Sequence, residues 1–108
     1  MILIVEDDDS IRETLKMFLD CIGQKCIEAR TLKEGLEKID DCSTILLDML
    51  LAGEDGAPII AAARKLKRPP YIVMMTALQN ADKLAEELKP DSLLKKPFDL
   101  DTLMNLLH

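Results

Sequence analysis

The sequence predicts a doubly wound α/β fold, in which one parallel sheet is covered by helices on both faces. Strand-like apolar runs alternate five times with helix-like amphipathic runs along the 108 residues. The strand-like runs are apolar throughout, which is typical of parallel strands that are buried on both faces. Helices that connect such strands form right-handed crossovers. We therefore expect one domain of common size, spanning residues 1–108.

The first strand and helix open the chain. The apolar run at residues 2–5 predicts a strand, and the sequence SIRETLKMFLDCIG follows at residues 10–23. Its apolar residues recur at helical spacing. Ser10 and Glu13 have the spacing of a capping box, and Gly23 suits the turn that ends a helix. These signals predict a helix capped by Ser10.

The next two units follow the same plan. KCIEA at residues 25–29 predicts a short strand, and TLKEGLEKI at residues 31–39 predicts a helix capped by Thr31. TILL at residues 44–47, apolar from Ile45 to Leu47, predicts the third strand. APIIAAARKL at residues 57–66 predicts a helix, with a proline in its first turn.

Prolines bound the last two units. YIVMMTA at residues 71–77 predicts the fourth strand, and NADKLAEELK at residues 80–89 predicts a helix that a proline ends. SLLKK at residues 92–96 predicts the fifth strand. DLDTLMNLL at residues 99–107 predicts the last helix, with Asp99 as its N-cap.

Composition excludes several classes of function. A net charge of −6 argues against a general nucleic-acid binder and against docking on anionic membranes. No apolar run approaches the roughly 20 residues that span a bilayer, and the N-terminal region has no signal-peptide pattern. We therefore expect a cytoplasmic domain with neither nucleic acid nor membrane as a partner.

The three cysteines are Cys21, Cys26 and Cys42, and their spacing fits no common zinc pattern. A redox or metal role is one interpretation. We favour the alternative, in which they are small buried hydrophobic residues in a reducing compartment.

Charged and hydroxyl side chains follow four of the five predicted strands, at the point where each strand ends. The carboxyl ends of parallel strands meet at the same edge of a sheet, and this edge is where such folds bind ligands. We therefore expect these side chains to form one site. They are Glu6 and Asp7 after the first strand, Asp48 where the third ends, Thr76 where the fourth ends and Lys96 where the fifth ends.

This set of groups suits phosphoryl chemistry. Three neighbouring carboxylates repel one another, and a hard divalent cation such as Mg²⁺ resolves the repulsion. A lysine can neutralise a phosphoryl oxygen, a threonine hydroxyl can bind another, and a carboxylate can be the nucleophile that forms an acyl phosphate. Phosphoryl transfer needs mainly positioning and charge neutralisation.

Each residue also has an ordinary structural interpretation. Asp9 is better explained as a charge that favours a helix N-terminus, and Asp8 as a surface residue. Asp48 could be a turn residue, Thr76 a helix cap and Lys96 a solvated cation. The order and strand placement of the whole set favour a common site over separate explanations.

The sequence resembles the receiver domain of two-component response regulators, the CheY-like superfamily, over essentially its whole length. Four motifs carry the resemblance, and they occur in the family's order: ILIVEDDDSIR, ILLDMLLAGEDG, IVMMTA and LLKKPFD. The resemblance implies a flavodoxin-like, five-stranded parallel sheet with the strand order 2-1-3-4-5.

The resemblance also implies a metal site. Asp48 would be both the phosphorylated residue and a ligand of Mg²⁺. Glu6 and Asp7 would be the acidic pair, with Asp7 as a direct ligand and Glu6 acting through water. The backbone carbonyl of Leu50 would complete the protein ligands.

Further residues would hold the phosphoryl group. Thr76, the backbone amide of Ala77 and Lys96 would bind it, and the Lys96–Pro97 peptide would be cis. The sequence departs from the family at Leu93, where an aromatic residue is usual, and this departure concerns output rather than phosphorylation.

The resemblance implies that the domain takes a phosphoryl group from a histidine kinase or a histidine phosphotransfer protein. It would catalyse its own phosphorylation and dephosphorylation without being a conventional enzyme, and would act on a downstream protein or a fused output domain. A degenerate receiver that only binds partners is less favoured, because Asp48, Thr76 and Lys96 are intact. An aspartyl phosphohydrolase is disfavoured because Leu50 stands where it would need a second acid.

Overall fold

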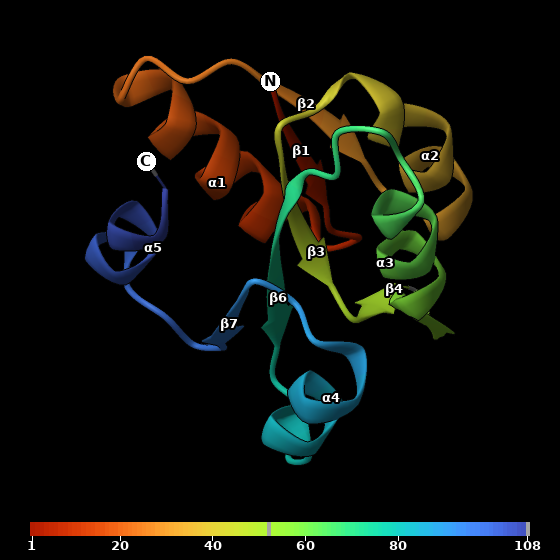
Figure 1. Cartoon of the computed structure of the whole chain (residues 1–108). Coiled ribbons are helices and arrows are strands. Elements are labelled where there is room, and N and C mark those ends of the chain that lie inside the picture. Colours follow the sequence, from red (N-terminus) through yellow and green to blue (C-terminus); the bar gives the residue numbers. More distant parts are fainter. Residues whose placement is uncertain (52, 108) are drawn as a thin grey trace.

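The computed structural model describes residues 1–51 and 53–107, and it confirms the doubly wound α/β fold (Figure 1). Five parallel strands form the main sheet in the order β2-β1-β3-β6-β7, which is the order 2-1-3-4-5 that the resemblance implies. The strands are β1 (Ile2–Val5), β2 (Cys26–Ala29), β3 (Thr44–Asp48), β6 (Tyr71–Thr76) and β7 (Ser92–Lys95).

Helices cover both faces of this sheet (Figure 1). α1 and α5 pack on one face, whereas α2, α3 and α4 pack on the other. Within the part of the chain that the structure describes, no helix has both the length and the apolar character needed to cross a bilayer. The helices are α1 (Asp9–Cys21), α2 (Leu32–Lys38), α3 (Ala57–Arg64), α4 (Ala81–Leu88) and α5 (Leu100–Leu106), and a 3₁₀ turn, η1 (Ile39–Asp41), follows α2.

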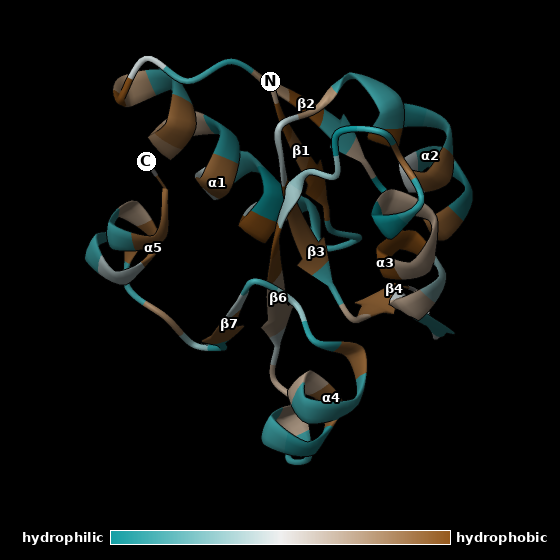
Figure 2. Cartoon of the chain, viewed as in Figure 1, coloured by the Kyte–Doolittle hydropathy of each residue, from teal (hydrophilic) through white to brown (hydrophobic). Residues whose placement is uncertain are grey.

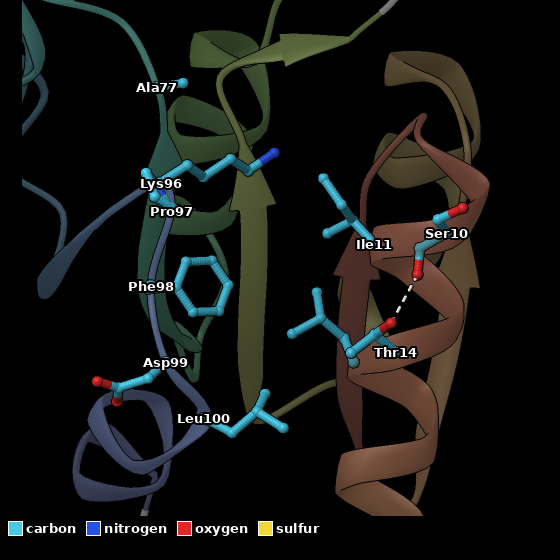
Figure 3. A pocket seen from close by; sticks show the side chains of 10 residues that line it. Ser10, Ile11, Thr14, Ala77, Lys96, Pro97, Phe98, Asp99 and Leu100 are labelled. Carbon is cyan, nitrogen blue, oxygen red and sulfur yellow. Dashed lines mark hydrogen bonds between the residues drawn. The ribbon is translucent and has the colours of Figure 1, made fainter.

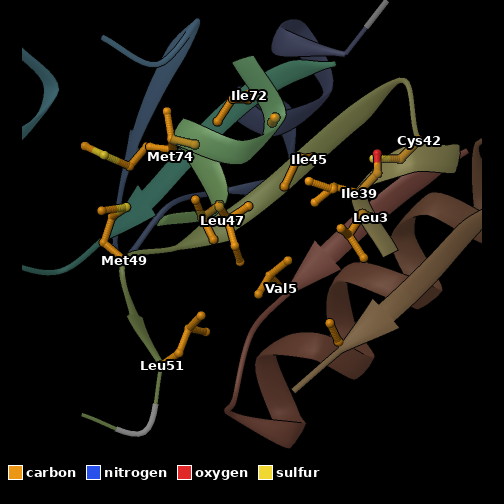
Figure 4. Close-up of a cluster of buried hydrophobic side chains, with 14 residues drawn as sticks. Leu3, Val5, Ile39, Cys42, Ile45, Leu47, Met49, Leu51, Ile72 and Met74 are labelled. Atoms are coloured by element: carbon orange, nitrogen blue, oxygen red, sulfur yellow. The ribbon is translucent and has the colours of Figure 1, made fainter. Parts of the chain in front are cut away.

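The strands form two hydrophobic cores because successive side chains point to opposite faces of the sheet. Leu3, Ile45 and Met74 are among the residues that face α2 and α3 (Figure 4). Ile4 and Leu46 face α1 and α5. Figure 2 shows the apolar strands between helices whose outer surfaces are largely polar. The fully apolar strands of the sequence are therefore explained by burial on both sides.

The caps at Thr31 and Asp99 are confirmed, since each side chain accepts a backbone hydrogen bond at its helix start. The cap predicted at Ser10 is wrong. α1 begins at Asp9, two residues before the start that a Ser10 cap implies, and the Asp8 carboxylate accepts the bond from the Ile11 amide at 3.0 Å. Aspartate is as good an N-cap as serine. Helix propensity therefore does not choose between Asp8 and Ser10, and the turn after β1 places Asp8 at the cap.

A short hairpin follows β3 and was not predicted from the sequence. It pairs β4 (Leu50–Leu51) with β5 (Glu54–Asp55) in antiparallel fashion. Two-residue strands are too short to show periodicity. At Gly56, just after the hairpin, a Cβ atom would lie 2.8 Å from the Asp48 carbonyl oxygen, so only glycine lets the chain return this closely.

The cysteines are all free, and only two of them fit the expected burial. Cys42 is buried and Cys26 is half-buried, whereas Cys21 is exposed. Burial raises the pKa of the Cys42 and Cys26 thiols, which lowers their reactivity at neutral pH. The expectation is wrong for Cys21 because the last turn of α1 presents this residue to solvent.

Candidate functional site

The structure brings the three predicted carboxylates together at the carboxyl edge of the sheet. Glu6 and Asp7 follow β1 and Asp48 ends β3, and these two strands are neighbours. One carboxylate oxygen from each residue lies within 4.8 Å of the others. Glu6 is fully buried and Asp48 is only 7% exposed, whereas Asp7 faces solvent. The cluster is therefore open on the side of Asp7.

Lys96 extends into this cluster from the end of β7. Its Nζ atom lies 2.6 Å from Glu6 Oε1 and 3.5 Å from Asp48 Oδ2. The strand β7 ends one residue earlier than predicted, but the Lys96 amide still donates to the Thr76 carbonyl at 2.8 Å. The following Lys96–Pro97 peptide is cis, as the resemblance implies.

Burial and neighbouring charge shift the pKa values of the paired groups. Burial raises the pKa of Glu6 to about 7, and the adjacent Asp48 carboxyl adds to the rise while Lys96 opposes it. Burial alone would lower the pKa of Lys96. The hydrogen bond to Glu6 and the attraction of Asp48 outweigh burial, so the pKa of Lys96 is raised. Lys96 therefore stays charged and serves as the internal cation of the acidic cluster.

Backbone amides orient two more groups at this edge. The Leu50 amide donates to Asp48 Oδ1 at 3.3 Å. The Leu78 amide donates to Thr76 Oγ1 at 3.0 Å, and Thr76 is buried. The hydroxyl proton of Thr76 is not used in that bond, so it can donate to another acceptor. Ala77, which supplies the predicted amide, is exposed beside it.

The donor set fits a hard divalent cation. Three carboxylates in one cluster offer only oxygen ligands, which Mg²⁺ and Ca²⁺ prefer to nitrogen or sulfur. Lys96 supplies one positive charge against the three acids, so the cluster keeps a negative excess when all three are ionised. A cation would be held by few protein ligands here, and this arrangement is usual for Mg²⁺, which keeps several waters.

An apolar groove of about 570 Å³ opens beside Lys96 (Figure 3). Ile11 and Thr14 of α1 form one wall, and Phe98 and Leu100 form the other. Asp99 points away from the groove (Figure 3). Hydrocarbon from these walls therefore borders Lys96.

A smaller cavity of about 250 Å³ lies between the β4–β5 hairpin and α4. Leu50 and Leu78 both line it, and they are 50% and 37% exposed. Leu50 follows Asp48 by two residues, and Leu78 follows Thr76 by two. The two leucines thus flank the group of polar side chains with aliphatic surface.

Sequence reasoning assigned no function to Arg12, which the structure connects to the acidic pair. Arg12 is 7% exposed, and its Nη1 donates to the backbone carbonyl of Glu6 at 3.0 Å. The sequence signal that could have revealed this contact is the position of Arg12 in the helix. Arg12 falls on the buried stripe of α1 with Leu15 and Leu19, and a charged residue in such a stripe needs a buried partner.

Solved structures share this architecture. The receiver domain protein described as CheY-like from Methanospirillum hungatei JF-1 superposes with a TM-score of 0.87 and 27% sequence identity, over 98% of this chain and 88% of that chain. The sequence also matches the family described as response regulator receiver domain over residues 2–108. The chain belongs to the response regulator receiver domain family.

Two curated relatives are transcriptional regulatory proteins. KdpE, the KDP operon regulator of Escherichia coli (strain K12), is 34% identical over 110 residues, which cover 99% of this chain and 49% of the relative. PhoB, the phosphate regulon regulator of Pseudomonas aeruginosa, is 36% identical over 106 residues, which cover 90% of this chain and 45% of the relative. The chain thus spans about half the length of these relatives.

Proposed function

We propose that this domain is a phosphoacceptor of two-component signalling and that Asp48 is the residue it phosphorylates. The observation that carries the proposal is the position of Asp48. Its carboxylate is almost buried, lies next to two further acids, and has Lys96 Nζ 3.5 Å from Oδ2. A carboxylate with a cation beside it and oxygen ligands around it is suited to attack phosphorus.

The reaction is a displacement at phosphorus. An oxygen of Asp48 forms a bond to the phosphorus of a phosphohistidine while the phosphorus–nitrogen bond breaks, and the imidazole leaves and takes up a proton. Lys96 neutralises charge on the phosphoryl oxygens, and the Thr76 hydroxyl and the Ala77 amide donate hydrogen bonds to them. This mechanism calls for little movement at Lys96, which already lies beside Asp48.

Asp7, Asp48 and the Leu50 carbonyl would hold Mg²⁺, with Glu6 acting through water. Bound Mg²⁺ supplies positive charge that offsets the negative charge of the acids and of the incoming phosphoryl group. The exposure of Asp7 supports its assignment as the direct ligand, since a hydrated cation must enter from solvent. Both oxygens of buried Glu6 already have partners, in Lys96 and the Asp8 amide, which supports an indirect role.

The phosphoryl donor would be a histidine kinase or a histidine phosphotransfer protein in the cytoplasm. Because KdpE and PhoB are transcriptional regulators of about twice this length, we propose that residues 1–108 form one receiver domain that acts on a fused output domain or on a separate protein. The output surface would consist of α4, β7 and α5.

Intact-mass measurement with acetyl phosphate tests this function. We expect a gain of one phosphoryl group with Mg²⁺ present and no gain when EDTA removes the metal. A degenerate receiver gains nothing under either condition. A phosphohydrolase releases inorganic phosphate continuously without a lasting gain in mass.

A further inference from the structure

Arg12 joins three separate segments of the chain near the acidic cluster. Its Nη1 donates to the Glu6 carbonyl at 3.0 Å, its Nη2 bonds to the Asp9 carboxylate, and its Nε lies 3.3 Å from Glu28 Oε1 in β2. The guanidinium is nearly buried, although Asp9 is exposed. Each of its three nitrogen atoms therefore has a partner, and this fixes the direction in which Arg12 points.

The contact with the Glu6 carbonyl determines how the acidic pair is held. That carbonyl belongs to the peptide unit that joins Glu6 to Asp7. The Glu6 amide is bound to the Ala29 carbonyl at 3.0 Å, so Arg12 secures the opposite side of the residue. A peptide unit is planar, and fixing its oxygen therefore fixes the plane from which both acidic side chains depart.

We infer that Arg12 is a positioning residue for the acidic pair: by binding the Glu6 carbonyl, it sets the spacing between the Glu6 and Asp7 carboxylates that a divalent cation requires. This inference rests on the proposed function for its cation. It concerns no contact between Arg12 and the metal, since the guanidinium acts only through the backbone.

The charge of Arg12 and its positioning role predict opposite changes in Mg²⁺ affinity when Arg12 is replaced. As a cation near the site, Arg12 repels a divalent cation. If charge were its only influence, Arg12→Met would therefore tighten Mg²⁺ binding. If Arg12 positions the acids, the same substitution weakens binding, because the Glu6 carbonyl loses its partner and the turn relaxes.

Arg30 provides a matched control. It also bonds Asp9, at 2.8 Å, but its side chain is 60% exposed, and its only described bond is to Asp9. Arg30→Met removes one positive charge from beside the same Asp9 carboxylate and leaves the Glu6 carbonyl bound to Arg12. Arg12→Lys is the conservative variant, because it keeps the charge and loses the planar fork that serves three partners at once.

The experiment measures Mg²⁺ affinity by calorimetry at a temperature where circular dichroism shows each variant folded. We expect the Kd to rise about tenfold in Arg12→Met, as for other residues that orient ligands. It rises less in Arg12→Lys and stays equal or falls slightly in Arg30→Met. If Arg12→Met does not fold, the inference is tested by whether the Kd for Mg²⁺ is higher in Arg12→Lys than in Arg30→Met. Equal or tighter binding in the Arg12 variants overturns the inference.

A second readout needs no metal. Amide hydrogen exchange in EDTA should be faster at Glu6 in the Arg12 variants, relative to Met49, whose amide bonds Met75 across the neighbouring strands at 3.2 Å. An unchanged ratio overturns the inference. If the wild type binds no Mg²⁺, the proposed metal site fails, and the exchange ratio alone decides whether Arg12 holds the turn.

Discussion

The ammonium group of Lys96 lies 2.6 Å from the Glu6 carboxylate, although 90 residues separate the two in the chain. The distance from Lys96 to Asp48 is longer, at 3.5 Å. Without metal or phosphoryl group, Lys96 therefore pairs mainly with Glu6. Both partners are largely shielded from water, so their titration affects the stability of the fold.

Glu6 should make the metal-free protein less stable as the pH rises. Its folded pKa of about 7 lies above the ordinary value of 4.5, so the folded state holds a proton that the unfolded chain releases. The resulting stabilisation is complete below the unfolded pKa and is lost as the pH rises through the folded one. Glu6→Gln removes this dependence.

Thermal melts in EDTA from about pH 5 to about pH 8 check the sign of this effect. The melting temperature of the wild type should fall relative to that of Glu6→Gln over this range. Parallel curves for the two proteins would show that Glu6 does not titrate there.

Asp7→Asn should weaken Mg²⁺ binding by at least about tenfold, because it removes the charge of the proposed direct ligand. It should leave the metal-free melting temperature equal or slightly higher, since one source of repulsion is lost. Asp8→Asn is the matched control, because asparagine also caps helices and Asp8 caps α1. A metal-free Asp7→Asn protein that melts well below wild type would indicate a structural role for Asp7.

Leu50 and Leu78 should slow the loss of the phosphoryl group. Both line the cavity between the β4–β5 hairpin and α4, and neither can hydrogen-bond the water that hydrolysis requires. The double variant Leu50→Asn with Leu78→Glu should lose its phosphoryl group about tenfold faster, which corresponds to about 1.4 kcal/mol of barrier. The decay is followed in Mg²⁺ after the donor is removed, and equal rates in the two proteins would refute the effect.

Leu93 should move little on phosphorylation. It is half-buried and packs against the core cluster that contains Met74. A leucine has no hydroxyl group that must stay in water, so burying it further changes only aliphatic surface. Structures with and without a phosphoryl mimic should show a shift at Thr76 and almost none at Leu93. A large rotamer change at Leu93 would contradict this expectation.

Most of the fold could be predicted because burial on both faces leaves a plain pattern. β1 is apolar throughout and β3 is apolar from Ile45 to Leu47, and the two strands lie side by side inside the sheet with helices on either face. The hairpin at Leu50–Leu51 and Glu54–Asp55 could not be predicted, since two residues show no periodicity. The start of α1 was misplaced because Asp8 and Ser10 are both good caps.

The proximity of these polar side chains could also be predicted, because the topology of a parallel sheet gathers whatever follows its strands. Which of these side chains pair with one another could not be predicted from the sequence. That Lys96 contacts Glu6 more closely than Asp48 depends on side-chain conformation, and that Arg12 binds the Glu6 carbonyl depends on the turn after β1. Tertiary contacts of this kind leave no pattern in the local sequence.

The central claim is that Asp48 itself carries the phosphoryl group, and a mass comparison of two variants tests it most directly. Asp48→Asn keeps the shape of the side chain and removes the nucleophilic oxygen. Asp55→Asn is the control, because Asp55 is an exposed acid of the nearby hairpin whose Oδ1 accepts from the Ala57 amide, as an asparagine oxygen also can. With acetyl phosphate and Mg²⁺, Asp55→Asn should gain one base-labile phosphoryl group and Asp48→Asn none. A gain in Asp48→Asn at the wild-type rate would contradict the assignment.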